Sequence, residues 1–556
     1  MNNKSIAKQF KLYSQLMELN AENPFRIRAI SSAAFKIDKL PVSASKATVE
    51  ELSSYPGIGK STAERIVSII KTGTFKELED LKDKTPPGVI EMLDIKGVGP
   101  KKIKSIWQDL RIESIGELLY ACNENRLKDA KGFGIKSQES IKNTIEFMLE
   151  NKGWLLYAKA EIIAQELYNL LDKSVAPTGR LEYTGDFRRK AETLCSIDFL
   201  TNIPLVKIEE SILTKNIPLS ITEQSEKQIL AQYHGSIDIK IIYSSDEDFA
   251  LNWIYSTGSS DHLQKLPPSL ASAESEKEIY KKMGLAYIEP ELREGLNEVV
   301  LAKENRLPTL IKVSDLKGSL HNHTTYSDGV HTIEEMALYS KEKLNLEYLG
   351  ICDHSQTAVY AGGLSKQDIE RQWVEIEDLN EKLAPFKIFK GIESDILADG
   401  SLDYPDDILA KFDLVVASVH SGLRMDKTRA TQRLIKAIEN PYTTILGHPT
   451  SRLLLSRPGY PLDFKKIIEA CAANNVVIEI NANPLRLDLD WRWYHYAVEK
   501  GVLLSINPDA HKQEGLLDVQ YGIHVARKGG LEAKNCLNAM NLQEIETFLQ
   551  NKKRNA

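Results

Sequence analysis

The first 40 residues carry apolar side chains at helical spacing. Ile6, Phe10 and Tyr13 recur three or four positions apart, and Leu16 and Met17 extend the same face. The pattern predicts two helices between residues 5 and 40. From residue 153 to 262, helical segments are interrupted by strand-like runs such as SIDFL (196–200) and SIDIKIIY (236–243). The chain therefore begins with helical domains, which an α+β domain follows.

Beyond residue 316 the pattern changes to short apolar strands that alternate with helices. The strand-like pieces are GSLH, YLGIC, KIFKGI, DLVVASV, TTILG, VVIEI and LLSIN. Strands that alternate with helices indicate parallel βαβ units. These seven pieces predict an α/β barrel, a distorted (βα)7 relative of the TIM barrel.

Side chains suited to metal binding follow these strands where each of them ends. The carboxyl ends of parallel barrel strands meet on one face, where the active sites of such barrels lie. Imidazole and carboxylate are ligands of zinc, manganese and iron. Nine such residues are expected to converge there: His321, His323, Asp328, His354, Glu393, His420, His448, Asp509 and His511. Nine ligands exceed the needs of one ion, so we expect a site for two or three, which suits phosphoester hydrolysis.

Three segments of the first 150 residues repeat a turn, apolar-Gly-apolar-Gly, that opens a helix. They are YPGIGKSTAERIVSII (55–70), IKGVGPKKIKSIWQDL (95–110) and AKGFGIKSQESIKNTI (130–145), of which the third fits less well. Such glycines let a turn approach a phosphate backbone, and the helix N-terminus directs N–H groups at phosphate oxygens without reading base sequence. The residues predicted to bind DNA are Gly57, Gly59, Lys60, Gly97, Gly99, Lys101 and Lys102.

Charge and composition modify this picture only slightly. The net charge is −7, yet residues 1–150 hold 24 Lys and Arg against 20 Asp and Glu, a weakly basic front compatible with a DNA partner. Five scattered cysteines form no CxxC pair, as in reduced cytosolic proteins. No apolar run approaches the ~20 residues of a membrane span, and no signal peptide is evident. We expect a cytoplasmic monomer that does not associate with membranes.

The strand-end motifs LHNHTTYSDG, GICDHS, GIESD, SVHSG, GHP and PDAH resemble those of the PHP (polymerase and histidinol phosphatase) domain over residues 316–556. The resemblance implies three ion positions, with manganese or zinc as the metal and iron as a further candidate. His321, His323, Glu393 and Asp509 would hold one ion, Glu393, His420 and His448 a second, and Asp328, His354 and His511 a third. Glu393, His323 and Asp509 would be catalytic. Arg424 and Lys512, near two strand ends, are candidates for orienting the phosphate.

The hairpins, together with ENPFRIRAISSAAFKI (22–37), TGDFRRKAETLCSIDFL (184–200), TGSSDH (257–262) and GLAYIEPELRE (284–294), resemble family X DNA polymerases. The whole chain is thus similar to the bacterial DNA polymerase X family, which joins such a polymerase to a PHP domain. The resemblance implies the following division: a helix-hairpin-helix DNA-binding domain (1–85), a fingers-like helix-hairpin-helix domain (86–152), a nucleotidyltransferase palm (153–262), a thumb-like subdomain with linker (263–315) and the PHP domain (316–556).

The chain departs from this family at the palm. The resemblance implies three metal-binding carboxylates, but the corresponding positions here are Ser196, Asp198 and Asp238. The family's Gly-Ser before a double arginine contacts the nucleotide phosphates, whereas here Asp186 precedes Phe187-Arg188-Arg189 and would repel a triphosphate. We therefore expect a degenerate polymerase site that binds magnesium only if polymerase activity survives.

A second departure concerns the helix after the first hairpin. Some family members excise a sugar-phosphate remnant there through a lysine Schiff base. Arg65 stands at the matching position and cannot form that adduct, so lyase activity is not expected.

The sequence predicts a DNA-repair enzyme that acts as a 3′–5′ exonuclease and hydrolyses phosphodiesters at 3′ ends of gapped or nicked DNA. Cleavage at abasic sites is a further candidate activity. A monovalent cation is a candidate ligand of the hairpins. One alternative is an active gap-filling polymerase with an accessory nuclease, which Asp198, Asp238 and TGSSDH support. Another is a non-catalytic DNA-binding scaffold, but a structural metal site needs only four ligands. A small-molecule phosphatase would leave the three hairpins without a purpose.

Overall fold

The structure is a computed structural model that describes residues 3–40, 42–95, 97–128, 130–150, 153–175, 179–235, 237–268 and 271–554. Its internal contacts divide the chain into two compact units, Met1–Phe147 and Met148–Ala556. No helix within the described ranges is long and apolar enough to cross a membrane.

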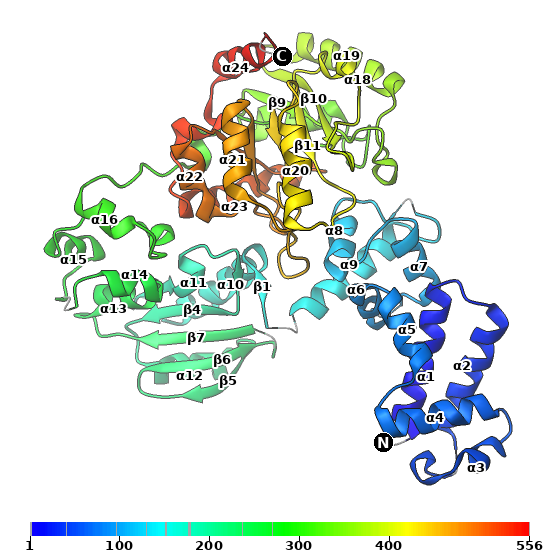
Figure 1. Cartoon of the computed structure of the whole chain (residues 1–556). Helices are drawn as coiled ribbons and strands as arrows, with labels where there is room; N and C mark the ends of the chain where they lie inside the picture. The colour runs from blue at the N-terminus through cyan, green and yellow to red at the C-terminus, as the bar shows by residue number, and fades with distance from the viewer. Residues whose placement is uncertain are drawn as a thin grey trace. The chain divides into compact units, whose positions relative to one another are not determined.

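The first unit is helical (Figure 1). Its elements are α1 (Asn3–Leu19), α2 (Pro24–Asp38), α3 (Val49–Ser53), α4 (Lys60–Thr72), α5 (Lys76–Lys84), α6 (Pro87–Glu91), α7 (Pro100–Gln108), α8 (Ile115–Asn123) and α9 (Ile135–Glu150), with short 3-10 turns η1 (Ala44–Lys46) and η2 (Met92–Asp94). The predicted helical pair before residue 40 is confirmed. Helix α1 buries its apolar face, and Phe10 stacks on Phe75 with ring centroids 5.6 Å apart.

The second unit begins with a five-stranded sheet in order β2-β4-β7-β6-β5, in which only the β4–β7 pair is parallel. We call residues 153–262 the palm-like region and residues 263–315 the thumb-like region. The palm-like region contains β1 (Leu155–Leu156), α10 (Tyr157–Val175), β2 (Leu181–Thr184), α11 (Gly185–Arg188), β3 (Thr193–Leu194), β4 (Ser196–Thr201), α12 (Leu205–Thr214), β5 (Leu219–Gln224), β6 (Gln228–Tyr233), β7 (Ile237–Tyr243) and α13 (Phe249–Thr257). Helix α14 (Ser260–Lys265) spans the boundary, and the thumb-like region adds α15 (Glu276–Lys282), η3 (Pro290–Leu292), α16 (Glu298–Lys303) and η4 (Val313–Asp315). The first residue of the strand-like run 236–243, Ser236, lies outside the described residues.

The barrel forms the rest of the second unit. All seven strands are parallel, in order β14-β13-β12-β11-β10-β9-β8, and a parallel bridge between Asn322 and Ala510 brings the two edges together. The strands are β8 (Gly318–Ser319), β9 (Tyr348–Ile351), β10 (Lys387–Asp395), β11 (Leu414–Ser418), β12 (Ile445–Leu446), β13 (Val477–Asn481) and β14 (Leu504–Asn507). The expected (βα)7 barrel is therefore confirmed.

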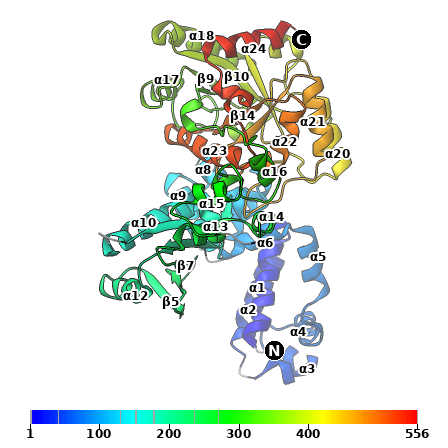
Figure 2. The same cartoon turned by 90° about the vertical axis from the view of Figure 1, so that its left-hand side faces the viewer.

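Helices cover the outside of the barrel, as α20 and α21 illustrate (Figures 1 and 2). The helical elements are α17 (Ile333–Leu338), η5 (Tyr339–Lys343), η6 (Val359–Ala361), α18 (Lys366–Leu383), α19 (Asp406–Leu409), α20 (Lys427–Ile438), α21 (Phe464–Ala473), η7 (Trp491–Trp493), α22 (Tyr494–Glu499), η8 (Gln513–Asp518), α23 (Val519–Lys528), η9 (Ala533–Asn535), η10 (Leu537–Ala539) and α24 (Leu542–Arg554). Their apolar faces pack on strands that are buried on both sides, as parallel strands require.

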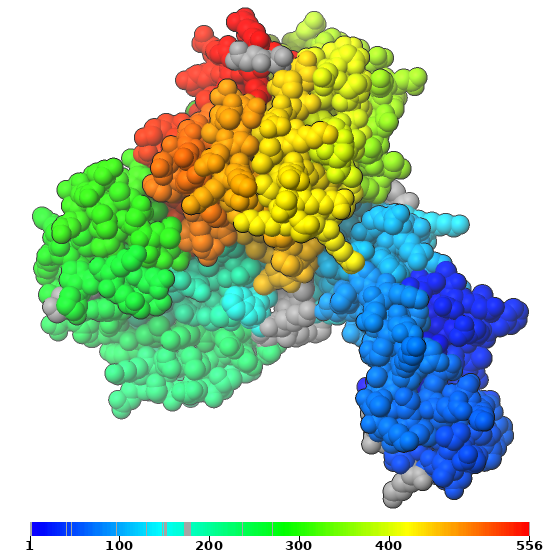
Figure 3. All heavy atoms as spheres, viewed as in Figure 1, coloured from blue at the N-terminus to red at the C-terminus, as the bar shows by residue number. Residues whose placement is uncertain are grey.

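Barrel helix α23 carries several of the contacts that attach the palm-like and thumb-like regions to the barrel. All three belong to the second compact unit, which Figure 3 colours from cyan through green to red. Arg527 Nε donates to Glu291 of η3 at 2.7 Å. Lys528, which is buried, donates to the backbone oxygen of Arg189 at 2.9 Å and also pairs with Glu294. Burial lowers the pKa of the Lys528 ammonium although Glu294 raises it. A buried ammonium needs such partners, so these contacts hold the regions together.

Candidate metal centre

The nine predicted ligands converge at the carboxyl ends of the barrel strands. The segment after β8 carries His321, His323 and Asp328, that after β9 carries His354, β10 carries Glu393, and the segments after β11, β12 and β14 carry His420, His448, Asp509 and His511. Each of these side chains is almost fully buried, with at most 9% exposed. His448 (φ 21°) and Asp509 (φ 54°) adopt left-handed backbone conformations. Such conformations cost energy in residues other than glycine and cluster at functional sites.

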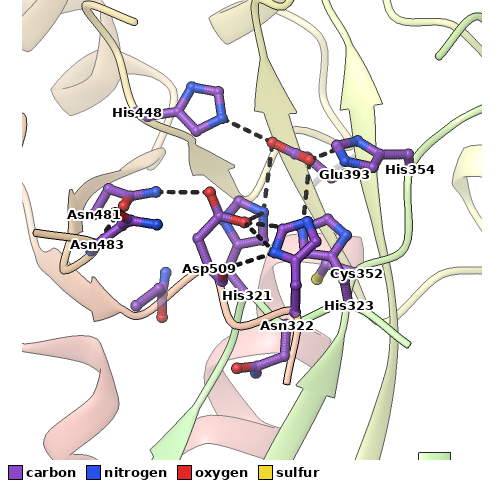
Figure 4. Close-up of polar contacts among 12 residues, drawn as sticks. His321, Asn322, His323, Cys352, His354, Glu393, His448, Asn481, Asn483 and Asp509 are labelled. Atoms are coloured by element: carbon purple, nitrogen blue, oxygen red, sulfur yellow. Dashed lines mark hydrogen bonds and ion pairs between the residues drawn. The ribbon is translucent and has the colours of Figure 1, made fainter. Parts of the chain in front are cut away.

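Glu393 lies at the middle of this cluster (Figure 4). Its Oε1 is 2.9 Å from His448 Nε2 and 3.2 Å from His420 Nε2, while its Oε2 is 2.9 Å from His354 Nδ1. His321 Nε2 approaches Oε1 to 3.5 Å. A carboxylate whose two oxygens face different imidazoles can bridge two metal ions, as predicted for Glu393.

Asp509 and Asp328 complete the cluster on the side of His323. His323 Nε2 is 3.0 Å from Asp509 Oδ1, which His321 Nε2 also faces at 3.6 Å. Asp328 Oδ1 is 3.1 Å from His511 Nε2, and its Oδ2 is 3.4 Å from His354 Nε2. Ligand atoms of His323, Asp328, His354 and His511 lie within 4.8 Å of one another. The same holds for His321, His323 and Glu393, and for His354, Glu393 and His420.

Two further carboxylates orient the imidazoles from outside the cluster. Glu479 on β13 is fully buried, and its Oε1 lies 2.7 Å from His321 Nδ1. Asp395 pairs with His420 Nδ1. Carboxylates in this position fix the tautomer and turn Nε2 towards a metal. Sequence reasoning missed both, although a glutamate inside an otherwise apolar buried strand was a signal for Glu479.

The charges of the cluster shift the pKa values of its members in opposite directions. Burial lowers the pKa of His321, but Glu479, Asp509 and Glu393 raise it well above its usual value. Burial together with His511 and His354 lowers the pKa of His323 to about 3. Burial raises the pKa of Glu393, but His420, His354 and His321 hold it well below its ordinary range. Opposite shifts of adjacent groups are typical of functional sites.

The residues fit divalent metal ions. His321 Nε2 and His323 Nδ1 are buried ring nitrogens without a hydrogen-bond partner among the described residues. A buried polar atom without a partner is costly, and a cation would satisfy both nitrogens. The ligands are imidazole and carboxylate only, the set that zinc, manganese and iron share.

Five other polar residues of the barrel are not among the nine proposed ligands. Arg424 and Lys512 are exposed. His331 Nδ1 accepts from the backbone N–H of Gln513 at 3.3 Å, and His495 is exposed on α22. His524 packs against Tyr157 with ring centroids 5.1 Å apart. These three histidines, which do not directly follow a barrel strand, have structural or surface positions.

The three glycine turns have the same backbone geometry. Gly57, Gly97 and Gly132 have φ values of 87°, 88° and 88°, so the third segment shares the conformation of the first two. Helices α4 and α7 begin directly after Gly59 and Gly99, and no side chain of the described residues caps either N-terminus. Their first N–H groups are thus available for an anion. Lys60 and Lys101 are exposed, and Lys102 lies over the Phe133 ring at 5.5 Å.

Ser196 and Asp238 lie side by side on the parallel strands β4 and β7. Ser196 Oγ donates to Asp198 at 2.7 Å, and Gln232 donates to Asp238 at 3.2 Å. Burial raises the pKa of Asp198, although the Ser196 hydrogen bond lowers it. The structure therefore brings the three predicted positions together, but a hydroxyl stands where the first carboxylate is needed.

The double arginine beside these strands pairs with carboxylates of the protein. Arg188 donates to both oxygens of Glu276, at 2.8 and 2.7 Å, and lies over the Trp253 ring at 3.6 Å. Arg189 pairs with Asp186 and, at 3.1 Å, with Glu294. Both guanidinium groups thus have anionic partners already.

Arg65 also has a structural environment. It donates to Glu77 at 3.1 and 2.8 Å and lies over the rings of Tyr13 and Phe75 at 5.8 and 5.9 Å.

Comparison with known proteins agrees with this architecture. A helix-hairpin-helix family matches residues 1–75, and a SAM-like helix-hairpin-helix tandem family matches residues 89–146. The chain is 34% identical to the DNA polymerase/3′-5′ exonuclease PolX of Bacillus subtilis (strain 168), covering 99% of this chain and 100% of that protein. A probable phosphatase of Thermoanaerobacter sp. (strain X514) is 30% identical over 42% of this chain and 94% of its own length.

Fold and site together define a multidomain protein in which helix-hairpin-helix domains and a mixed α/β region precede a PHP-type barrel with a histidine-rich centre. The chain belongs to the bacterial DNA polymerase X family.

Proposed function

We propose that this protein is a DNA-repair nuclease whose barrel hydrolyses phosphodiester bonds at the 3′ ends of gapped or nicked DNA. The observation that carries the proposal is the convergence of nine buried imidazoles and carboxylates, with Glu393 at their middle. A structural metal site needs four ligands, so an assembly of nine favours chemistry over structure. The named activity of the Bacillus subtilis relative supports the same substrate.

The chain's own residues would act by positioning. Divalent ions bound at this centre would supply Lewis acidity and lower the pKa of a bound water. Glu393 would keep adjacent ion positions together through its two oxygens, while Asp328 and Asp509 would hold the outer ones. Glu479 and Asp395 hold His321 and His420 in the required orientation. The low exposure of all these groups keeps solvent out and strengthens their electrostatic effect.

The hairpins would bind the DNA substrate. The uncapped starts of α4 and α7, with Lys60, Lys101 and Lys102 beside them, would contact phosphates and leave the bases unread. We propose that the first hairpin belongs to a domain of residues 1–85 and the second and third to a domain of residues 86–152. These two domains precede a palm (153–262), a thumb with linker (263–315) and the PHP domain (316–556).

We further propose that the palm has lost most of its polymerase activity. Ser196 supplies no carboxylate. Asp186 stands where the family has a phosphate-contacting serine, and Arg188 and Arg189 beside it already pair with Glu276, Asp186 and Glu294. An active polymerase is the second candidate function, because Asp198 and Asp238 are retained and because the Bacillus subtilis relative is named a polymerase.

The test compares Glu393→Gln with the wild-type chain on 3′-labelled gapped DNA with manganese. We expect nucleotide release by the wild type, its loss with a chelator, and a drop of more than about 100-fold in the variant, since even outer-sphere changes cost 10- to 100-fold. Glu377→Gln is the matched control, because that side chain is 65% exposed on α18. Wild-type rates in the Glu393 variant would show that the centre does not perform the hydrolysis.

A further inference from the structure

His420 is the most accessible imidazole of the metal centre. Its side chain is 7% exposed, whereas the side chains of the other five proposed histidine ligands are at most 2% exposed. A phosphodiester can approach buried ligands only from a side that solvent already reaches. The structure therefore indicates that a substrate enters beside His420, at the carboxyl end of β11.

A basic segment begins directly after this histidine. Residues 421–429, which we call the basic segment, contain Arg424, Lys427 and Arg429 against a single carboxylate, Asp426. All three cations are exposed. The segment joins β11 to the first turn of α20. Because the helix after a barrel strand begins at the carboxyl end of that strand, the basic segment lies on the same face of the barrel as the metal centre.

The loop after β10, the neighbour of β11 in the barrel, has the opposite charge. Residues 396–407 contain no lysine or arginine, and Asp399, Asp406 and Asp407 are exposed. Lys436 of α20 lies 2.9 Å from Asp399 and compensates only one of these carboxylates. A polyanion is repelled by this loop and attracted by the basic segment. The charges on the two sides of His420 thus favour approach of DNA over residues 421–429.

Helix α20 holds the basic segment in place. Arg433 is buried and donates to the backbone oxygens of Ser421 and Leu397, at 2.9 and 2.8 Å. The Asp426 carboxylate accepts from the backbone N–H of Arg429 at 2.9 Å and so caps the helix. The segment is therefore ordered before a ligand binds, which lowers the entropy cost of binding.

Two cations of the basic segment can accept an anionic ligand without giving up a strong partner. Within the part of the chain that the structure describes, the Arg429 guanidinium has no hydrogen bond or ion pair. Lys427 Nζ lies 3.8 Å from Asp463, which is beyond hydrogen-bond length, and the Lys427 side chain is 59% exposed. Arg188 and Arg189 of the palm-like region differ in this respect, because both already pair with carboxylates.

We propose that the DNA strand reaches the metal centre over the basic segment, where Lys427 and Arg429 bind phosphates on the 5′ side of the cleaved bond. The inference rests on the proposed hydrolysis of DNA at this centre. It makes the barrel itself a binding site for a polynucleotide strand, in addition to the hairpins. Contacts to phosphates do not read bases, so the barrel binds the strand without sequence preference.

The first test measures competition at the metal centre of the full chain with manganese. The substrate is bis(p-nitrophenyl) phosphate, a diester with a single phosphate, and the competitor is a single-stranded oligonucleotide with cleavage-resistant phosphorothioate linkages at its 3′ end. In Lys427→Gln/Arg429→Gln, the ratio of the oligonucleotide KI to the small-diester KM should rise about 10- to 30-fold, since each exposed charge contact is worth up to about fivefold. The slope of log KI against log salt should fall by about 1.4, because each phosphate contact on a single strand contributes about 0.7.

Lys382→Gln/Lys411→Gln is the matched control. It also removes two exposed cations, but from the segments that precede β10 and β11, at the opposite end of the barrel. This variant should keep the KI-to-KM ratio and the salt slope of the wild type.

Photocrosslinking gives a readout that does not depend on catalysis. An oligonucleotide with a photoreactive group near its 3′ end, bound to the metal-free full chain, should crosslink to peptides from residues 421–433 in the wild type and less in Lys427→Gln/Arg429→Gln. Crosslinks to residues 396–407 in place of these peptides would show that the strand approaches over the acidic loop, and the inference would be wrong.

A KI-to-KM ratio within about twofold of wild type in Lys427→Gln/Arg429→Gln would refute the inference. A raised ratio with an unchanged salt slope would also refute it, because the loss would then not come from phosphate contacts. If the oligonucleotide competes through these two cations but the wild type cleaves no DNA with any metal, the proposed function fails while this inference stands. If DNA is cleaved and the variant binds the oligonucleotide normally, the reverse holds. If neither ester is hydrolysed, the proposed function fails and the crosslinks decide this inference.

Discussion

Glu276 connects the palm-like and thumb-like regions through a buried ion-pair triad, and its removal has a predictable cost. Its carboxylate accepts from Arg188 at 2.8 and 2.7 Å and from Arg293 at 2.7 and 3.1 Å, and its side chain is 5% exposed. Burial raises the pKa of Glu276, but the hydrogen bonds from the two arginines outweigh it and lower the pKa to about 2.

The pKa shift sets the size and the pH range of the effect. A fall from 4.5 to about 2 corresponds to about 3 kcal/mol at 1.36 kcal/mol per pH unit. Because the folded pKa is the lower one, this stability is fully present above about pH 4.5 and is lost as the pH falls towards 2. At pH 3.5 about 2 kcal/mol should remain. Glu276→Gln should remove this stabilisation and leave the charge of the fully buried Arg293 without its carboxylate partner.

Hydrogen exchange followed by mass spectrometry measures the local stability around Glu276. A local measurement is needed because a multidomain chain does not unfold in a single step. At pH 7, peptides from α11, α13 and α15 should exchange about 100-fold faster in Glu276→Gln than in the wild type, since each 1.4 kcal/mol is a tenfold change. Peptides from β9 to β11 should not change. Glu278→Gln, an exposed change on the same helix, is the control. A difference at pH 3.5 as large as that at pH 7 would refute the assignment to the Glu276 carboxylate.

Two other predictions concern DNA binding and polymerisation. Gly97→Ala should weaken the salt-dependent binding of DNA, because its added Cβ meets no other described residue within 4 Å and would instead face the phosphate backbone. Gly73→Ala, with φ 81° and equally open surroundings among the described residues, should bind DNA normally. Equal binding by both variants would show that the hairpin turn does not approach DNA. In a chain whose barrel is disabled by Glu393→Gln, the double change Ser196→Asp and Asp186→Ser should raise primer extension. Brisk primer extension by the Glu393→Gln chain without these two changes would establish the second candidate function, an active polymerase.

The sequence predicted the architecture because its signals are local. Each barrel strand is a short apolar run that ends in a polar motif, and each hairpin is a glycine turn followed by a helix, so both can be recognised without knowledge of tertiary contacts. The strand order of the barrel then follows from parallel βαβ connections. The same rule brought the nine ligands to one face, and the structure places them there.

The supporting groups could not be predicted because they act through contacts distant in sequence. Glu479 reaches His321 across 158 positions, and Arg452 reaches Glu192 across 260. Neither pair carries a motif. The sequence thus indicates which groups can bind metal, while their orientation depends on tertiary packing.

The two carboxylate sites of the chain differ in how their polar atoms are satisfied. In the barrel, His321 Nε2 and His323 Nδ1 remain without hydrogen-bond partners among the described residues although they are buried, a costly state that a bound cation would relieve. On β4 and β7, by contrast, Asp198 and Asp238 accept from neighbouring side chains of the protein. A metal ion would have to displace these bonds and would gain only two carboxylates in return. The same physical criterion therefore favours metal binding in the barrel and disfavours it in the palm-like region.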